Sequence, residues 1–186
     1  MVKRLTAIAG CALVVLYPVF IYFGLNLFDP RWLSLVLIAA VGLRCLGPRL
    51  PQPFLLAFAV ALFTTCSLTL LSGAEWGLFI YPVLVNGLLC VLFVTSLWRG
   101  PSVIETLARL SEPDLAPSGV AYTRKVTWVW ALFFALNGTI AAMTITLGRE
   151  WWALYNGFIA YLLMALLFSA EWWVRRRVRE HHHGFR

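Results

Sequence analysis

The side chains that could do chemistry inside the apolar part of this chain are amides and phenols rather than catalytic acids and bases. The only histidines, His181–His183, lie in a polar C-terminal segment, so none can serve as a base or a metal ligand among the apolar segments. The sequence has no glycine-rich phosphate loop, no serine elbow and no paired acidic metal motif. We therefore expect no catalytic residue, no metal site and no cofactor.

Asparagine followed by glycine occurs within three of the apolar runs, at Asn86, Asn137 and Asn156. In soluble proteins this pair is typical of a turn, but within a membrane helix every backbone group must be bonded internally. Glycine then permits close helix contact, and asparagine can hydrogen-bond to a neighbouring helix. Together with Tyr81 and Tyr155, these asparagines could line one polar ligand pocket, or they could simply hold helices together.

The elements that must position these side chains are membrane helices. Of the 186 residues, 61% are hydrophobic and only 12% are charged, which is unlike any soluble globular domain. The net charge of +7 does not indicate nucleic-acid binding, because the basic residues lie at the ends of apolar segments, as topology signals do. The four cysteines form no CxxC pair, so neither a disulfide framework nor a zinc site is predicted.

Six apolar segments approach the roughly 20 residues that are needed to cross a membrane. The first is longer than the apolar region of a signal peptide and is followed by no small-residue cleavage site, so we interpret it as a retained span. The second is the shortest, and whether it crosses fully is left open. We expect an all-α polytopic membrane protein that forms a single membrane domain over residues 1–186. Its predicted spans are 5–28, 32–46, 54–71, 78–98, 126–147 and 151–172.

The orientation follows from the distribution of basic residues. If the N-terminus is inside, only Arg31 and Arg149 of the 15 lysines and arginines fall outside. Both termini are therefore predicted to be cytoplasmic. Tryptophans at the predicted span ends would form the interfacial belts of such a protein. They are Trp32, Trp76, Trp98, Trp151, Trp152, Trp172 and Trp173.

The longest polar stretch within the chain, residues 99–125, is predicted to lie on the cytoplasmic side between the fourth and fifth spans. Ser102 precedes Glu105 by three residues, which is the spacing of a capping box. Apolar residues then recur at helical intervals, so we expect a short amphipathic helix over Ser102–Ser111 on the membrane surface, ended by Pro113 and Pro117. The stretch could be an ordinary connector or a docking surface for a cytoplasmic partner. The candidate docking residues are Glu105, Arg109, Arg124 and Lys125.

Two charged residues, Arg44 and Glu171, are predicted to lie at the cytoplasmic edge of the membrane. A charge left in hydrocarbon costs about 2.5–3.5 kcal/mol on insertion scales. Glu171 is therefore expected either to be interfacial or to pair with Arg44 or Arg175, and a proton-linked or substrate-contacting role is the alternative. Residues 173–186 form a basic tail, which we expect to be cytoplasmic and to contact anionic lipid.

The second half of the chain contains a set of short motifs. They are Trp98–Ser102, Ile104-Glu105, Leu107–Arg109, Glu112–Asp114, Tyr122–Trp128, Phe133-Phe134, Asn137-Gly138, Leu154–Gly157, Tyr161–Met164 and Glu171-Trp172. This pattern resembles a family of uncharacterised bacterial inner-membrane proteins that are often encoded in aryl-polyene (xanthomonadin-like) biosynthetic clusters. The first three spans match that family only as hydrophobic helices and through Tyr17-Pro18.

The resemblance implies a bacterial inner-membrane location among soluble enzymes of the type II fatty-acid synthesis kind, and it supplies no catalytic residue. We expect membrane lipids as partners. The resemblance implies cytoplasmic ketosynthase or acyl carrier proteins as further partners. The first functional hypothesis is a non-enzymatic accessory or scaffold protein that docks such enzymes. The second is a transporter or flippase for a lipid or small solute, with its polar pocket among spans four to six. The third, a membrane acyltransferase, lacks a histidine–carboxylate motif. The oligomeric state is left open.

Overall fold

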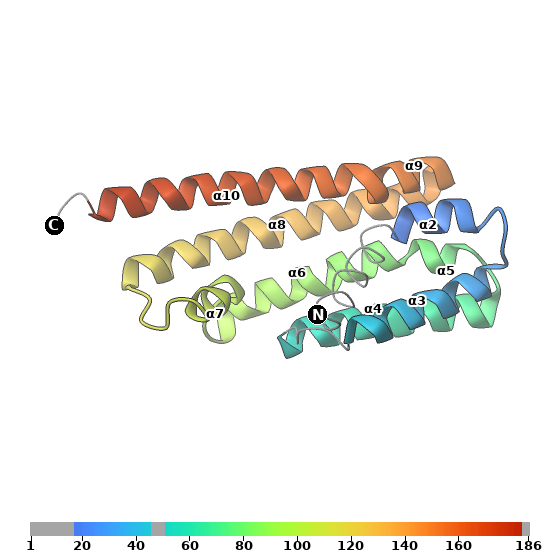
Figure 1. The fold of residues 1–186 in the computed structure, drawn as a ribbon, viewed down its shortest axis with the longest axis horizontal. Helices are drawn as coiled ribbons and strands as arrows, with labels where there is room; N and C mark the ends of the chain where they lie inside the picture. The colour runs from blue at the N-terminus through green and yellow to red at the C-terminus, as the bar shows by residue number, and fades with distance from the viewer. Residues whose placement is uncertain (1–16, 46–50, 184–186) are drawn as a thin grey trace, which may run out of the picture.

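The computed structural model describes residues 17–45 and 51–183, and within this part of the chain every regular element is helical (Figure 1). Side chains are described for residues 18–39 and 51–176. The elements are α2 (Tyr17–Gly24), α3 (Pro30–Cys45), α4 (Gln52–Ser72), α5 (Trp76–Phe79), α6 (Tyr81–Arg99), α7 (Val103–Arg109), α8 (Pro117–Leu147), α9 (Arg149–Leu154), the π-helical turn η1 (Tyr155–Ile159) and α10 (Ala160–His183).

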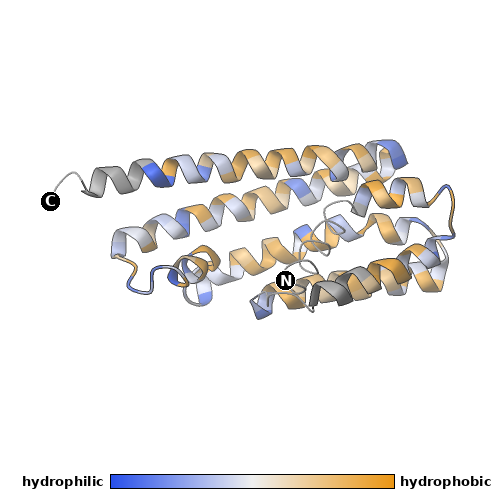
Figure 2. Cartoon of the chain, viewed as in Figure 1, coloured by the Kyte–Doolittle hydropathy of each residue, from blue (hydrophilic) through white to orange (hydrophobic). Residues whose placement is uncertain are grey.

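Four helical stretches are long and apolar enough to cross a membrane: Gln52–Ser72, Trp76–Arg99, Pro117–Leu147 and Arg149–Arg176. Large apolar side chains remain exposed along these helices, and Figure 2 shows hydrophobic residues predominating along them. Such a surface suits lipid rather than water. This confirms the predicted all-α, multi-pass membrane class. Six spans stay a prediction, because α3 is described over 16 residues, fewer than the roughly 20 that a span needs, and only Tyr17–Gly24 of the first predicted span is described as helix.

The long helices alternate in direction, so their connections gather at two ends of the bundle (Figure 1). The turns at residues 25–29, residues 73–75 and Gly148 share one end, which we call the turn end. The α7 helix and its connection to α8 lie at the other end, which we call the α7 end. α4 finishes at Gly73, whose φ of +68° is the left-handed conformation that terminates many helices.

Arg149 joins the turns at the turn end. Its guanidinium donates to Oδ1 of Asn26 over 2.8 Å and forms an ion pair with Glu75. Asn26 follows α2, Glu75 precedes α5 and Arg149 begins α9, so one side chain links three hairpin connections. The charge of Arg149, one of the two basic residues predicted to be outside, is thus partly neutralised by Glu75.

Several boundaries differ from the sequence prediction. α8 begins at Pro117, so residues 117–125 of the predicted polar loop are helical. Proline has no amide proton to lose at the first helical position, where its fixed φ favours the helix. Pro117 therefore starts a helix rather than ending one. α2 ends at Gly24, four residues before the predicted end of the first span, and the backbone of the predicted tail stays helical to His183.

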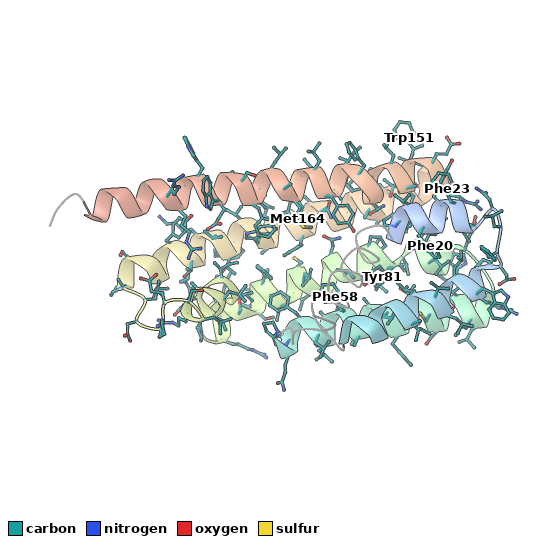
Figure 3. All side chains as sticks on the ribbon, in the orientation of Figure 1. Phe20, Phe23, Phe58, Tyr81, Trp151 and Met164 are labelled. Carbon is teal, nitrogen blue, oxygen red and sulfur yellow. The ribbon has the colours of Figure 1, made fainter. Side chains whose placement is uncertain are left out.

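Trp152 also differs from its predicted place in an interfacial belt. It is 0% exposed, its Nε1 donates to the carbonyl of Phe79 over 3.0 Å, and the two rings are 4.6 Å apart. The other tryptophans of the predicted belts are exposed, and Figure 3 shows Trp151 projecting from the bundle. Trp151 and Trp152 are adjacent on one helix, so they point about 100° apart, and here Trp152 faces the bundle interior while Trp151 faces outward.

The α7 end is held by an aromatic cluster between α6 and α8. Phe93 lies edge-on to Phe134 with ring centroids 5.1 Å apart, and Val103 of α7 is buried in the same cluster. Met164 of α10 packs on its margin (Figure 3). α7 therefore folds back on the ends of α6 and α8. Its amphipathic pattern predicts a helix on the membrane surface, but Val103 is buried against these two helices.

Candidate functional site

Three of the predicted pocket residues form a chain of hydrogen bonds inside the bundle. The Tyr155 hydroxyl donates to Oδ1 of Asn137 over 2.8 Å. Nδ2 of Asn137 donates to Oδ1 of Asn86 over 3.0 Å, and Nδ2 of Asn86 donates to the carbonyl of Pro82 over 2.8 Å. All three side chains are buried. The chain ties η1, α8 and α6 together.

The other two predicted pocket residues lie apart from this chain of bonds. Nδ2 of Asn156 donates to Oγ1 of Thr144 over 3.3 Å and to the carbonyl of Trp152 over 2.9 Å. Tyr81 is buried in the apolar cluster that contains Trp152 and Phe79. The five residues are therefore all buried, and three of them are joined by direct hydrogen bonds.

Glycine permits close helix approach at two of the three asparagine–glycine pairs. A Cβ added to Gly138 would lie 3.0 Å from Cβ of Asn86, and one added to Gly157 would lie 3.2 Å from Cγ2 of Val19. A Cβ added to Gly87 would meet nothing within 4 Å. The packing interpretation accounts for these contacts and for the bonds above, while the ligand-pocket interpretation stays a prediction.

The π-helical turn η1 is a feature that sequence reasoning missed. It covers Tyr155–Ile159, and its first two side chains, Tyr155 and Asn156, are both buried. The signal available in the sequence was the Asn156-Gly157 pair, which weakens a regular helix. Such turns are frequent at functional sites.

The predicted docking residues of α7 mostly bond within the protein. The Ser102 hydroxyl accepts from the amide of Glu105 over 3.3 Å, which confirms the capping interaction. Glu105 is 7% exposed, and its Oε1 accepts from Nε and Nη2 of Arg109 over 3.0 and 2.9 Å. Nη1 of Arg109 donates to the carbonyl of Pro113 over 2.9 Å. This pair fixes α7 and the connection that follows it.

The two docking candidates on α8 have exposed side chains. Nη2 of Arg124 donates to the carbonyl of Leu97 over 3.0 Å, at the C-terminal end of α6. A cation at this position stabilises the negative end of the helix dipole. Lys125 is exposed beside it. The docking role of the four residues stays a prediction, and a change at Glu105 would alter local structure as well as any contact.

A groove of about 970 Å³ opens at the α7 end, where three helices converge. The residues on each helix recur every three or four positions, so one face of each helix lines the groove. These faces are Ile104, Leu107 and Ala108 on α7, Gly119, Tyr122, Val126 and Trp130 on α8, and Phe168, Glu171 and Arg175 on α10. The connection between α7 and α8 closes one side with Ser111, Glu112 and Leu115.

The groove is apolar at its floor and polar at its mouth. At the floor, the rings of Trp130 and Phe168 lie 4.5 Å apart and join α8 to α10. At the mouth, the Tyr122 hydroxyl donates to the backbone carbonyl of Glu171 over 3.4 Å. Long side chains therefore bridge α8 and α10 here, and they leave space between the two helices.

Helix length places the mouth at the predicted membrane boundary. α8 has 31 residues, which is about 46 Å of helix against a hydrocarbon core of about 30 Å. About 20 residues counted back from Leu147 reach Trp128, so Trp130 lies at hydrocarbon depth and Tyr122 beyond it. The same length counted forward from Trp151 reaches Glu171. By this count the groove lies across the predicted boundary between the interface and the hydrocarbon layer.

Glu171 and Arg175 are charged residues of the mouth that make no ion pair within the described side chains. The ion pairs among the described side chains join Arg109 to Glu105 and, at the turn end, Arg149 to Glu75. The predicted pairing of Glu171 with Arg175 is therefore not seen, and the side chain of Arg44 lies outside the described residues. Glu171 is half-buried, and its interfacial location stays a prediction.

The fold and the groove define this chain as a polytopic α-helical membrane protein with an amphipathic groove at one end of its helix bundle. No family model, curated protein or solved structure matches it. The resemblance to the aryl-polyene-cluster family stays a prediction.

Proposed function

We propose that this protein is a non-enzymatic accessory protein of the bacterial inner membrane that binds an amphiphile in the groove between α7, α8 and α10. The observation that carries the proposal is the gradient within the groove, from the polar mouth at Tyr122 and Glu171 to the apolar floor at Trp130 and Phe168. An amphiphile matches this gradient with its headgroup at the mouth and its chain at the floor.

The size and depth of the groove support the same proposal. Pockets of about 300–1,000 Å³ hold small-molecule ligands, and the groove has about 970 Å³. Because its mouth lies near the expected membrane boundary, a lipid could enter sideways without leaving the bilayer. On the predicted resemblance, the ligand would be an acyl or polyene chain and the α7 end would dock a ketosynthase or an acyl carrier protein, with Arg124 and Lys125 exposed for contact.

The alternative function, transport through a polar pocket among α6, α8 and α10, has less support. Asn86, Asn137 and Asn156 each bond other groups of the protein. A ligand there would have to replace these bonds. The geometry favours a site that holds a lipid over a path that crosses the membrane.

The orientation in this proposal places the α7 end in the cytoplasm. Ser118 is exposed at that end and Glu150 is exposed at the turn end. In a variant without native cysteines, we expect Ser118→Cys to react with a membrane-impermeant thiol reagent only after the cells are opened. Glu150→Cys should react in intact spheroplasts. The reverse pattern would overturn the orientation.

The groove is tested by measuring the lipid that co-purifies with the protein in mild detergent. Phe168 lines the groove and is 56% exposed, whereas Phe158 is 63% exposed and lies outside the groove lining. Loss of the contact that a ligand makes with an aromatic ring should cost about 1.5 kcal/mol, or roughly tenfold in affinity. We expect Phe168→Ala to lower lipid retention and Phe158→Ala to leave it unchanged. Equal retention by the two folded variants would overturn the proposal.

A further inference from the structure

We infer that the mouth of the groove selects an amphiphile whose headgroup carries both a phosphate and a primary ammonium, as phosphatidylethanolamine does. The inference rests on the proposed function, namely that the groove binds a lipid. It adds the chemical class of the headgroup.

Two opposite charges line the mouth one helical turn apart. Glu171 and Arg175 both belong to α10 and both line the groove, and within the described side chains neither forms an ion pair. A guanidinium binds phosphate oxygens through two parallel hydrogen bonds. A carboxylate accepts hydrogen bonds from an ammonium, which has three N–H donors. A zwitterionic headgroup can therefore bind both residues at once.

The position of Glu171 within the lining favours a headgroup that carries a cation. Glu171 lies one turn before Arg175 on α10, and both residues line the groove, so a headgroup bound there meets a carboxylate as well as a guanidinium. The neighbouring Arg176 is directed elsewhere, with its guanidinium carbon 5.0 Å from the centre of the Trp172 ring. A phosphatidylglycerol headgroup would leave Glu171 without a cation. A choline headgroup supplies the positive charge but has no N–H donor.

Depth supports the same assignment. Glu171 and Tyr122 lie at the expected level of lipid headgroups, while Trp130 and Phe168 lie at the level of acyl chains. The Tyr122 hydroxyl, which donates to the Glu171 carbonyl, keeps an oxygen lone pair that can accept from an ammonium. Headgroup and chain can thus be bound together without moving the lipid out of its leaflet.

The test uses the full-length protein in nanodiscs that contain equal amounts of phosphatidylethanolamine, phosphatidylcholine and phosphatidylglycerol with identical acyl chains. Lipids that stay bound after transfer to mild detergent are counted by native mass spectrometry. We expect the wild-type protein to retain phosphatidylethanolamine roughly fivefold to tenfold over phosphatidylglycerol, the effect of about one charge-assisted hydrogen bond near the surface. Phosphatidylcholine should fall between them.

Variants then assign the selectivity to the two side chains. Glu171→Gln should bring the retention of phosphatidylethanolamine down to that of phosphatidylcholine. Arg175→Ala should lower the retention of all three phospholipids, whereas the matched control Arg176→Ala should match the wild-type protein. Circular dichroism verifies that each variant is folded, and the wild-type comparison across the three lipids decides the matter even if one variant is not.

The outcomes separate this inference from the proposed function. If the wild-type protein retains the three lipids equally, or prefers phosphatidylglycerol, and Phe168→Ala still lowers retention, the headgroup assignment fails and the lipid groove stands. If Phe168→Ala and Phe158→Ala retain the same lipid, or if a co-purifying protein covers the groove in place of lipid, both fail.

Discussion

Replacement of Gly138 by alanine should force apart α6 and α8, which approach each other closely at this position. A Cβ at position 138 would lie 3.0 Å from Cβ of Asn86, where ordinary van der Waals contact begins at 3.4 Å. Both atoms are attached directly to helix backbones, so a change of rotamer cannot relieve the overlap. Relief requires α8 to move from α6 by several tenths of an ångström.

The magnitude follows from the kind of contact that is disturbed. Overpacking of a well-packed interior costs typically 1–3 kcal/mol. The shift would also lengthen the 3.0 Å bond from Asn137 to Asn86, and such a bond between membrane helices contributes about 0.6 kcal/mol on average. Alanine is itself favoured over glycine within a helix by about 0.5–1 kcal/mol, which offsets part of this cost.

Gly87→Ala is the matched control, because it changes the same residue type next to Asn86 and adds a Cβ where nothing lies within 4 Å. The helix-propensity gain is common to both variants, so their difference isolates the overlap. We expect Gly138→Ala to be less stable than Gly87→Ala by about 1–3 kcal/mol. The measurement is reversible unfolding in mixed micelles of rising SDS content, followed by circular dichroism. Equal unfolding midpoints would refute the close approach of α6 and α8.

Three further changes test the polar contacts of the bundle. Asn137→Ala should cost about 1–2 kcal/mol, more than Tyr155→Phe, because it removes both the acceptor of the buried Tyr155 hydroxyl and the donor to Oδ1 of Asn86; micelle unfolding measures both variants. Arg149→Ala should cost below about 1 kcal/mol, since its ion pair is partly exposed, and the loss should shrink in high salt in a thermal unfolding series. Glu105→Gln should weaken the bond from Arg109 to Glu105 that helps to hold the α7–α8 connection, and it should speed tryptic cleavage after Arg109 at least severalfold; an unchanged cleavage rate would contradict this role of the pair.

The groove exists because α8 and α10 are held differently at their two ends. Near the turn end, short contacts such as Asn156 to Thr144 join the η1 turn to α8. Near the α7 end, the helices meet through the larger side chains of Trp130 and Phe168. The two ends of this helix pair are therefore joined by different side chains, and the groove opens at the end where Trp130 and Phe168 meet.

The membrane class and several local features could be predicted from the sequence, because they depend on composition and on neighbours along the chain. The apolar runs required helices, since a backbone in hydrocarbon must satisfy its own hydrogen bonds. The Ser102–Glu105 spacing predicted a cap that the structure contains. The turn at Pro117 was misjudged because proline stops a helix from within and starts one at its first position, and local sequence does not decide between these cases.

The tertiary structure alone decided which polar side chains meet. Asn86 and Asn137 are 51 residues apart, and their bond depends on the rotation of α6 against α8. Asn156, which the prediction placed in the same set, bonds Thr144 of α8 and the carbonyl of Trp152. Likewise, the sequence identifies Trp130 and Phe168 only as apolar residues of separate helices. They form the floor of a groove because α8 and α10 lie side by side. Residue type fixes what a side chain can bond, whereas helix rotation and spacing, which arise from contacts distant in sequence, decide what it does bond.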